Sequence, residues 1–162
     1  MPDIVTIKFT GMEEFAALVD EMKNDFSEKD SKKILNKSIR LAMQPVLALA
    51  KQLAPVDTGA LQDSLRIEAR KPTTKDKRSV YVHNSDIAIG AITTAPANAM
   101  VKKGFADYKQ KARAIANEFG TAKMAAHPFM RPALEAAGQS AVDILASSFK
   151  TVLESYRAKN TK

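Results

Sequence analysis

An apolar stripe with helical spacing runs through the C-terminal part of the chain and constrains the fold more than any other feature. The stripe follows Pro132, a residue that suits the first turn of a helix, and it continues to Tyr156. Arg157 and Lys159 come next, where cations stabilise the C-terminus of a helix. The sequence therefore predicts one long C-terminal helix, whose apolar positions are Leu134, Ala137, Ala141, Ile144, Leu145, Phe149, Val152, Leu153 and Tyr156.

A second apolar stripe predicts another long helix over residues 31–53, with Ser31 as its N-cap. Pro45 lies inside this stripe. An interior proline costs a helix about 3 kcal/mol and usually bends it. We therefore expect one helix with a kink between Leu41 and Pro45, and not two separate helices.

The N-terminal residues switch from strand to helix periodicity. Residues 3–10 alternate between polar and apolar side chains, which predicts a β-strand whose apolar face carries Val5, Ile7 and Phe9. Residues 12–22 then show the spacing of an amphipathic helix.

The middle of the chain contains the other candidate strands. Residues 64–70 and 79–90 read as strands, and the basic stretch 71–78 reads as the loop between them. Residues 91–105 contain few core-forming side chains, which predicts an extended loop. Residues 107–119 fit a helix, although their C-terminal half also fits a strand.

These elements predict a single α+β domain over residues 1–162. A small antiparallel or mixed sheet would pack against the kinked helix and the C-terminal helix. Residues 158–162 would form a flexible tail. The length of 162 residues and the hydrophobic content of 45% suit one domain with a real core.

Composition argues against several classes of site. The chain has no cysteine, which excludes disulfides and thiolate metal ligands, and it has only two histidines, which argues against structural zinc. We expect no metal and no cofactor. No apolar run approaches the roughly 18–20 residues of a membrane span, so no membrane contact is expected.

The net charge of +7 is unevenly distributed. Residues 1–70 hold ten Lys and Arg against eleven Asp and Glu, whereas residues 71–162 hold fifteen against seven. Such asymmetry indicates contact either with nucleic acid or with an acidic neighbouring subunit. Aromatic residues make up only 6% of the chain and tryptophan is absent, which argues against a base-stacking surface for single strands.

Catalytic interpretations find little support. The triplet Asp57-Thr58-Gly59 resembles the catalytic loop of aspartic proteases, in which two carboxylates share a proton. That loop is built on β-strands, however, and here the triplet follows a predicted helix. His83 and His127 have no Ser or Asp at a spacing that indicates a triad. A small hydrolase is thus the weakest reading, and we expect no enzymatic activity.

Two short motifs instead have the character of structural corners. In residues 54–65, proline ends a helix, and polar side chains accept hydrogen bonds from backbone N–H groups of the turn that follows. Glycine then permits a backbone conformation that a residue with a Cβ resists, after which apolar side chains return to the core. Its key residues are Pro55, Asp57, Thr58, Gly59, Leu61 and Ser64. The second motif leads into the C-terminal helix, and its key residues are Glu118, Gly120, Thr121, Pro128, Phe129, Arg131 and Pro132.

In this order, the two motifs and the long final helix resemble the tail-completion, or head–tail joining, proteins of long-tailed bacteriophages. The resemblance covers most of the chain from about residue 31 onward. It implies a small structural α+β subunit that forms a ring, commonly hexameric, where the tail tube meets the head connector. The subunit would complete or terminate the tube. The implied partners are copies of the chain itself, tail-tube proteins and connector or stopper proteins.

The resemblance also implies a location in the neck of the virion, which is assembled in the cytoplasm of the bacterial host. It favours a strand at the C-terminal end of residues 107–119. The main alternative function is a basic accessory protein that binds nucleic acid. Within the ring reading, basic segments would touch either acidic subunits or, without sequence specificity, DNA in the channel.

Four charged residues are candidates for the contact between subunits. Glu118 of one subunit would pair with Arg131 of the next, and the alternative is a pair within one subunit that fixes the turn. Lys102 and Lys103, in the expected loop over residues 91–105, would reach a neighbouring subunit.

Overall fold

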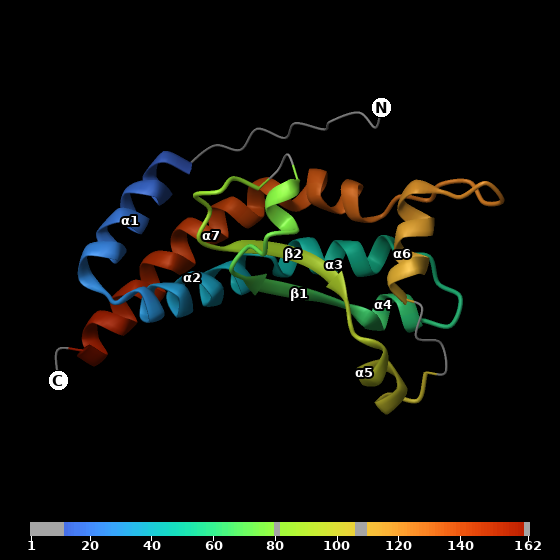
Figure 1. Cartoon of the computed structure of the whole chain (residues 1–162), viewed down its shortest axis with the longest axis horizontal. Coiled ribbons are helices and arrows are strands. Elements are labelled where there is room, and N and C mark those ends of the chain that lie inside the picture. Colours follow the sequence, from blue (N-terminus) through green and yellow to red (C-terminus); the bar gives the residue numbers. More distant parts are fainter. Residues whose placement is uncertain (1–11, 80–81, 106–109, 161–162) are drawn as a thin grey trace.

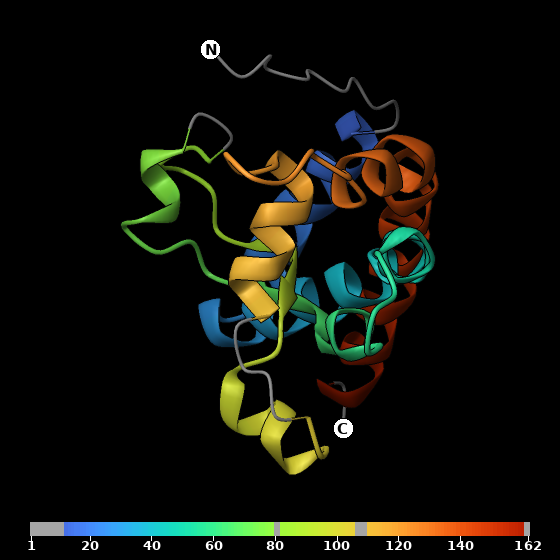
Figure 2. The same ribbon diagram turned by 90° about the vertical axis from the view of Figure 1, so that its right-hand side faces the viewer.

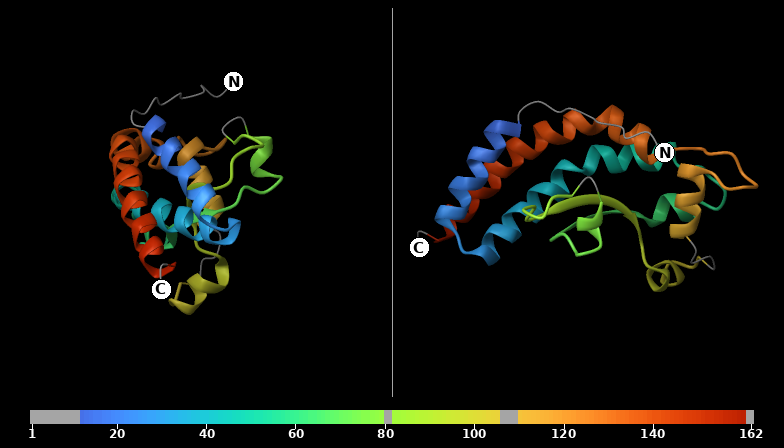
Figure 3. Two further views of the ribbon diagram at one scale, coloured as in Figure 1. Left: turned by 90° about the vertical axis from the view of Figure 1, so that its left-hand side faces the viewer. Right: turned by 45° about the horizontal axis from the view of Figure 1, so that its top comes forward.

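The computed structural model describes residues 12–79, 82–105 and 110–160. Figure 1 shows an elongated molecule in which helix α7 (Met130–Asn160) runs along most of the length. Helices α1 (Met12–Asp25), α2 (Glu28–Ala42) and α3 (Gln44–Leu53) pack against α7. The two strands lie on the other side of α2 and α3, so that the helices form a layer between α7 and the sheet, as the right panel of Figure 3 shows. The α+β class is confirmed.

The long helix over residues 31–53 is divided into α2 and α3 at Met43. Met43 keeps a near-helical backbone, with φ −80° and ψ −2°, and its N–H donates to the Ile39 carbonyl. Pro45 occupies the first turn of α3, where its missing N–H costs nothing. The predicted position of the break was correct, but the prediction of a single kinked helix was wrong. The N-cap prediction was also wrong, because Ser27 accepts from the Asp30 N–H and Ser31 is buried.

The sheet consists of β1 (Leu65–Arg70) and β2 (Ile89–Thr94), which pair antiparallel with Leu65 opposite Thr94 and Arg70 opposite Ile89. The predicted strand over residues 79–90 was wrong for residues 79 and 82–88, because β2 begins at Ile89, and residues 80–81 lie outside the described residues. The connection contains a short 3₁₀ helix, η1 (Asp76–Arg78). Arg70 donates to both carboxylate oxygens of Asp76, and this pair together with Thr73 holds the pKa of Asp76 well below its usual range.

Residues 91–105 are not an extended loop. They contain the end of β2 and helix α5 (Ala97–Lys102), which projects from the body of the molecule in Figure 2. Met100 is fully buried and provides the apolar anchor that the sequence seemed to lack. Residues 110–119 form helix α6 (Gln110–Phe119), so the strand favoured for this segment was wrong. The five-residue helix α4 (Ala60–Ser64) precedes β1.

The buried side chains form two clusters along α7. One lies under α1 and α2 and contains Met22, Ile34, Leu35, Phe149, Val152 and Leu153. The other joins α3, α4, β1 and α6 to the first half of α7 and contains Val46, Ala50, Ala54, Leu61, Leu65, Ala114, Phe129, Ala133, Ala137 and Ala141. The stripe predicted for the C-terminal helix therefore supplies side chains to both clusters.

The helix predicted over residues 12–22 is confirmed as α1, and α7 confirms the C-terminal helix. The expected tail at residues 158–162 is wrong for residues 158–160, which continue α7. The strand predicted over residues 3–10 lies outside the described residues.

Candidate functional site

The start of α7 is held by the carboxylate of Glu118, which lies at the end of α6. One carboxylate oxygen accepts from the N–H groups of Phe129 and Met130, both at 2.9 Å. The other accepts from the N–H of Arg131 at 3.1 Å and from its Nε at 3.0 Å. The first N–H groups of a helix have no partner within the helix, and a carboxylate satisfies them while it favourably meets the positive end of the helix dipole. Glu118 thus caps the N-terminus of α7, although it does not directly precede α7 in the sequence.

Glu118 is buried, with only 5% of its side chain exposed. Burial raises the pKa of its carboxyl group, but the hydrogen bonds from Met130, Phe129 and Arg131 outweigh this effect, so the pKa lies below the ordinary value. Both carboxylate oxygens accept hydrogen bonds from residues of the same chain. Glu118 pairs with Arg131 of its own chain, which is the alternative that the sequence left open. The contact between Glu118 and a neighbouring subunit stays a prediction.

Residues 120–128 form an exposed arm between α6 and α7, and Figure 1 shows it extending beyond the end of the molecule at which α6 lies. Hydrogen bonds within the arm and to α6 hold its backbone. Thr121 and Met124 exchange backbone bonds in both directions, and the N–H of His127 donates to the Asn117 carbonyl at 2.6 Å. Gly120 has φ +74°, and an added Cβ would lie 3.0 Å from the backbone of residues 124 and 126. Residues 121–128 are all exposed, so hydrogen bonds and not burial hold the arm.

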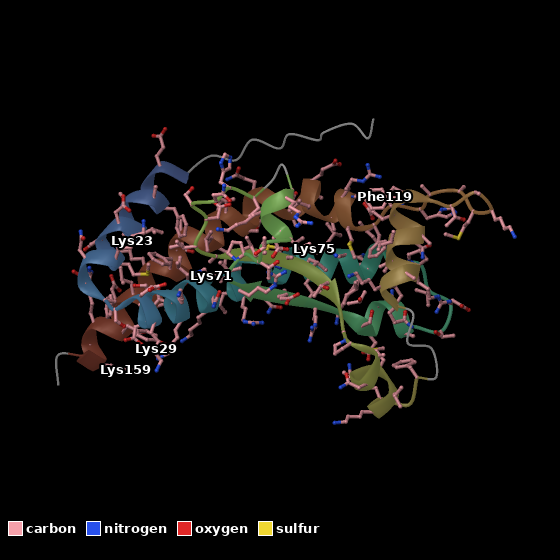
Figure 4. All side chains as sticks on the ribbon, in the orientation of Figure 1. Lys23, Lys29, Lys71, Lys75, Phe119 and Lys159 are labelled. Carbon is pink, nitrogen blue, oxygen red and sulfur yellow. The ribbon has the colours of Figure 1, made fainter. Side chains whose placement is uncertain are left out.

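An exposed apolar surface adjoins the base of the arm. Ile115 and Phe119 lie one turn apart on α6, with 52% and 64% of their surface exposed. The guanidinium of Arg131 lies 5.4 Å from the centre of the Phe119 ring, which is within cation–π range. A cavity of about 300 Å³ opens between this surface and β2. Phe119 is labelled in Figure 4, at the end of the molecule that carries α6.

The corner at residues 54–65 has the predicted construction. Ala54 ends α3 with an extended backbone before Pro55, and Gly59 adopts φ +72° at the start of α4. The Thr58 hydroxyl accepts from the Ala60 N–H at 3.4 Å. The buried Ser64 hydroxyl donates to the Leu61 carbonyl at 2.7 Å. These contacts are structural.

The structure brings the two predicted motifs together. Residues of the corner, of α6 and of the arm line one cavity of about 230 Å³, and these residues are Pro55, Asp57, Thr58, Gly59, Leu61, Arg113, Ala116, Asn117 and Met124. Arg113 also donates to the Asp57 carboxylate at 2.6 Å. Asp57 therefore joins the corner to α6 and is not paired with another carboxylate. Neither the role of Arg113 nor the exposed surface was predicted from the sequence, although apolar residues four apart on a helix would have revealed the surface.

The two lysines proposed for a subunit contact lie at the end of α5. Lys103 Nζ donates to the Asp63 carboxylate at 2.7 Å, which ties α5 to α4. Lys102 is exposed in the last turn of α5.

A second charged region lies far from the arm. Figure 4 shows Lys23, Lys29 and Lys159 at the opposite end of the molecule from Phe119. A cleft of about 420 Å³ in this region is lined by four lysines, Lys23, Lys32, Lys71 and Lys77, together with two acidic residues, Glu28 and Asp86. Several of these lysines already have partners, because Lys23 pairs with Asp20 and Lys32 with Glu28.

Within residues 12–79, 82–105 and 110–160, no group of three or more His, Asp or Glu side chains is placed to hold a metal ion. In the same ranges, no helix combines the length and the apolar character that crossing a bilayer requires.

Comparison with known families gives a match over part of the chain. Residues 16–95, slightly less than half of the 162, match the family described as "Bacteriophage HK97-gp10, putative tail-component". The resemblance to phage tail components is thereby confirmed. The matched region extends from α1 to the end of β2 and includes the corner at residues 54–65. No curated protein and no solved structure matches the chain. The match supports a structural role in a bacteriophage tail, and hence a place in the virion.

Proposed function

We propose that this chain is a ring subunit of the phage neck, which completes or terminates the tail tube and joins it to the head connector. The family match supports the tail component, and the order of the two motifs supports the more specific role. The structural observation that carries the proposal is the exposed pair Ile115 and Phe119 beside an arm held by backbone hydrogen bonds. By the same resemblance, the ring is a hexamer and its other partners are tail-tube and connector or stopper proteins.

Ring assembly requires a heterologous contact, in which one surface of a subunit meets a different surface of the next. An arm that is already ordered loses little conformational entropy when it binds, which favours its use in such a contact. Exposed apolar side chains that adjoin one another mark interaction surfaces more often than isolated ones do. Together, the arm and the Ile115–Phe119 surface provide one side of the proposed contact. Lys102 and Arg131 remain candidates for its charged rim.

The proposal is tested by the assembly state of the purified chain and of a Phe119→Asp variant. Size-exclusion chromatography with light scattering would give the mass, and negative-stain electron microscopy would show rings alone and on purified tails. We expect rings for the unchanged chain and loss of assembly for Phe119→Asp. Leu41→Asp is the matched control, because Leu41 is 43% exposed but lies on α2, away from the arm and from α5. A monomer that binds neither tails nor connectors would contradict the proposal.

The lysine-lined cleft favours a second role, the non-specific binding of DNA phosphates in the channel. Such binding would weaken steeply with salt and would show no sequence preference. Lys71→Glu should reduce the affinity for duplex DNA at low salt, whereas Lys111→Glu, on α6, should not. A monomer with strong, salt-sensitive DNA binding would favour the alternative of a nucleic-acid-binding accessory protein over the ring subunit.

A further inference from the structure

Two exposed apolar surfaces adjoin α6. Ile115 and Phe119 form the first, beside the cavity of about 300 Å³ that β2 and the start of α7 complete. The second belongs to the corner at residues 54–65, where Val56 is 70% exposed and Leu53, at the end of α3, is also exposed. Figure 1 shows this corner beside α6, at the end of the molecule that carries the arm.

The two surfaces lie on different sides of α6. Arg113 and Asn117 line the cavity that α6 shares with the corner, whereas Ile115 lines the cavity that α6 shares with β2. Successive helix residues lie about 100° apart around the helix axis, which places Ile115 roughly 160° from both Arg113 and Asn117. A subunit with different contact surfaces on opposite sides can meet one neighbour through each, as a closed ring requires.

The charges beside the two surfaces are opposite in sign. The Asp57 carboxylate of the corner is exposed, so it can accept from a second cation while it accepts from Arg113. On the other surface, Lys111 is exposed in the first turn of α6, and the partly exposed Arg131 lies beside the Phe119 ring. The corner of one copy is therefore complementary in charge to the α6 surface of another copy.

The cavity beside Ile115 has room for an apolar side chain of the corner. Its volume of about 300 Å³ exceeds the roughly 150 Å³ in which an apolar cavity binds benzene. The corner is also held in place, because Gln62 Nε2 donates to the carbonyls of Lys51 at 2.8 Å and Ala54 at 3.4 Å. A segment that is already fixed loses little conformational entropy on docking. The apolar lining of the cavity comes from Ile92, Ala114, Ile115, Phe119 and Met130.

We propose that the corner of one subunit docks on the α6 surface of the next, with Val56 in the cavity beside Ile115 and Asp57 facing Lys111. This inference rests on the proposed function, because it names the second surface of the ring contact. Each subunit uses both surfaces, one toward each neighbour, so that the same contact repeats around the ring. The corner and the end of α6 thereby supply the two halves of one contact.

Exchange of the two charges tests this contact. Asp57→Lys and Lys111→Asp should each impair assembly, because every contact in a ring of either variant joins two like charges. In an equimolar mixture, alternating subunits place an acidic group opposite a basic one at every contact. We expect the chain concentration needed for half-assembly, measured by light scattering at low salt, to rise about tenfold for each variant alone. In the mixture it should return to within about threefold of the value for the unchanged chain.

Lys150→Asp is the matched control, because Lys150 is an exposed lysine on the second half of α7. This variant should assemble like the unchanged chain, and it should not rescue Asp57→Lys. Circular dichroism of each variant would verify that it is folded.

The absence of cysteine from the chain allows a second test that does not depend on charge. Val56→Cys is mixed with Phe119→Cys or with Ile115→Cys, each on a separate chain, and one chain of each mixture carries an affinity tag that changes its mass. A disulfide requires Cβ atoms about 3.5–4.5 Å apart. We expect mild oxidation to link the two different chains in at least one mixture. Leu41→Cys, exposed on α2, replaces Val56→Cys in the control, which should not cross-link.

The outcomes separate this inference from the proposed function. Rings that show neither a cross-link from Val56→Cys to α6 nor rescue by charge exchange would overturn the docking of the corner, while the ring subunit would stand. Disulfides between two Phe119→Cys chains would also overturn it, because the α6 surface would then meet itself. A chain that forms no ring, alone or on purified tails, would overturn both.

Discussion

Replacing Glu118 by alanine tests whether a buried carboxylate organises the start of α7. The substitution removes the acceptor of three backbone N–H groups and one guanidinium N–H. Phe129 is fully buried, so its N–H would be left without a partner and without access to water. The N–H groups of Met130 and Arg131 are less buried, and water entering the vacated space would replace part of their bonds.

The expected destabilisation is about 3 kcal/mol. An unsatisfied buried donor costs about 1–3 kcal/mol, and we assign roughly 2 kcal/mol to the Phe129 N–H. Loss of the capping bonds and of the charge at the helix N-terminus adds about 1 kcal/mol. For a domain of this size, each kcal/mol lowers the melting temperature by about 2–4 °C, which gives a decrease of roughly 6–12 °C.

Urea denaturation followed by circular dichroism would measure the free energy of unfolding, and thermal melts would measure the shift in Tm. Asp57→Ala is the control, because Asp57 also accepts from an arginine at 2.6 Å but has 73% of its side chain exposed. An exposed pair contributes about 0–1 kcal/mol. A loss below about 1 kcal/mol for Glu118→Ala, or one no larger than that of the control, would refute the capping argument.

Three further predictions concern the same elements. The pKa of Glu118 is lower in the folded state than its ordinary value of 4.5. The carboxylate therefore stabilises the fold above pH 4.5, and this stabilisation is lost as the pH falls through the folded-state pKa. Glu118→Gln should thus flatten the fall in Tm below about pH 4.5. Gly120→Ala should cost about 1–2 kcal/mol in urea denaturation, since alanine resists φ +74° and its Cβ would crowd the arm; no measurable loss would show that the arm adapts. Arg40→Leu should lower stability by about 1 kcal/mol and speed exchange at the edge of β1, and unchanged values would mean that the bonds to Ile67 and Ala69 contribute nothing.

Much of the fold follows from local sequence signals. The stripe after Pro132 predicts α7, and the break near Pro45 and the helix end before Pro55 follow from the missing N–H and the fixed φ of proline. Residues 79–94 show why the strand boundaries could not be predicted from local sequence signals. Val82 and Ile87 have a composition typical of a strand, but among the described residues of this segment only 89–94 pair with β1. Pairing with a neighbouring strand decides where a strand forms.

The sequence by itself determined where helices end and turns begin, since proline, glycine and helical periodicity act on the nearest few residues. Only the tertiary structure decided which distant residues those turns contact. Glu118 and Phe129 are eleven residues apart, and their bond exists because α6 ends beside the start of α7. The exposure of Phe119 likewise depends on which surfaces other elements leave free. Local backbone preferences determine the helices and turns, whereas burial and hydrogen bonds between residues distant in the sequence determine the capped helix start and the exposed surface.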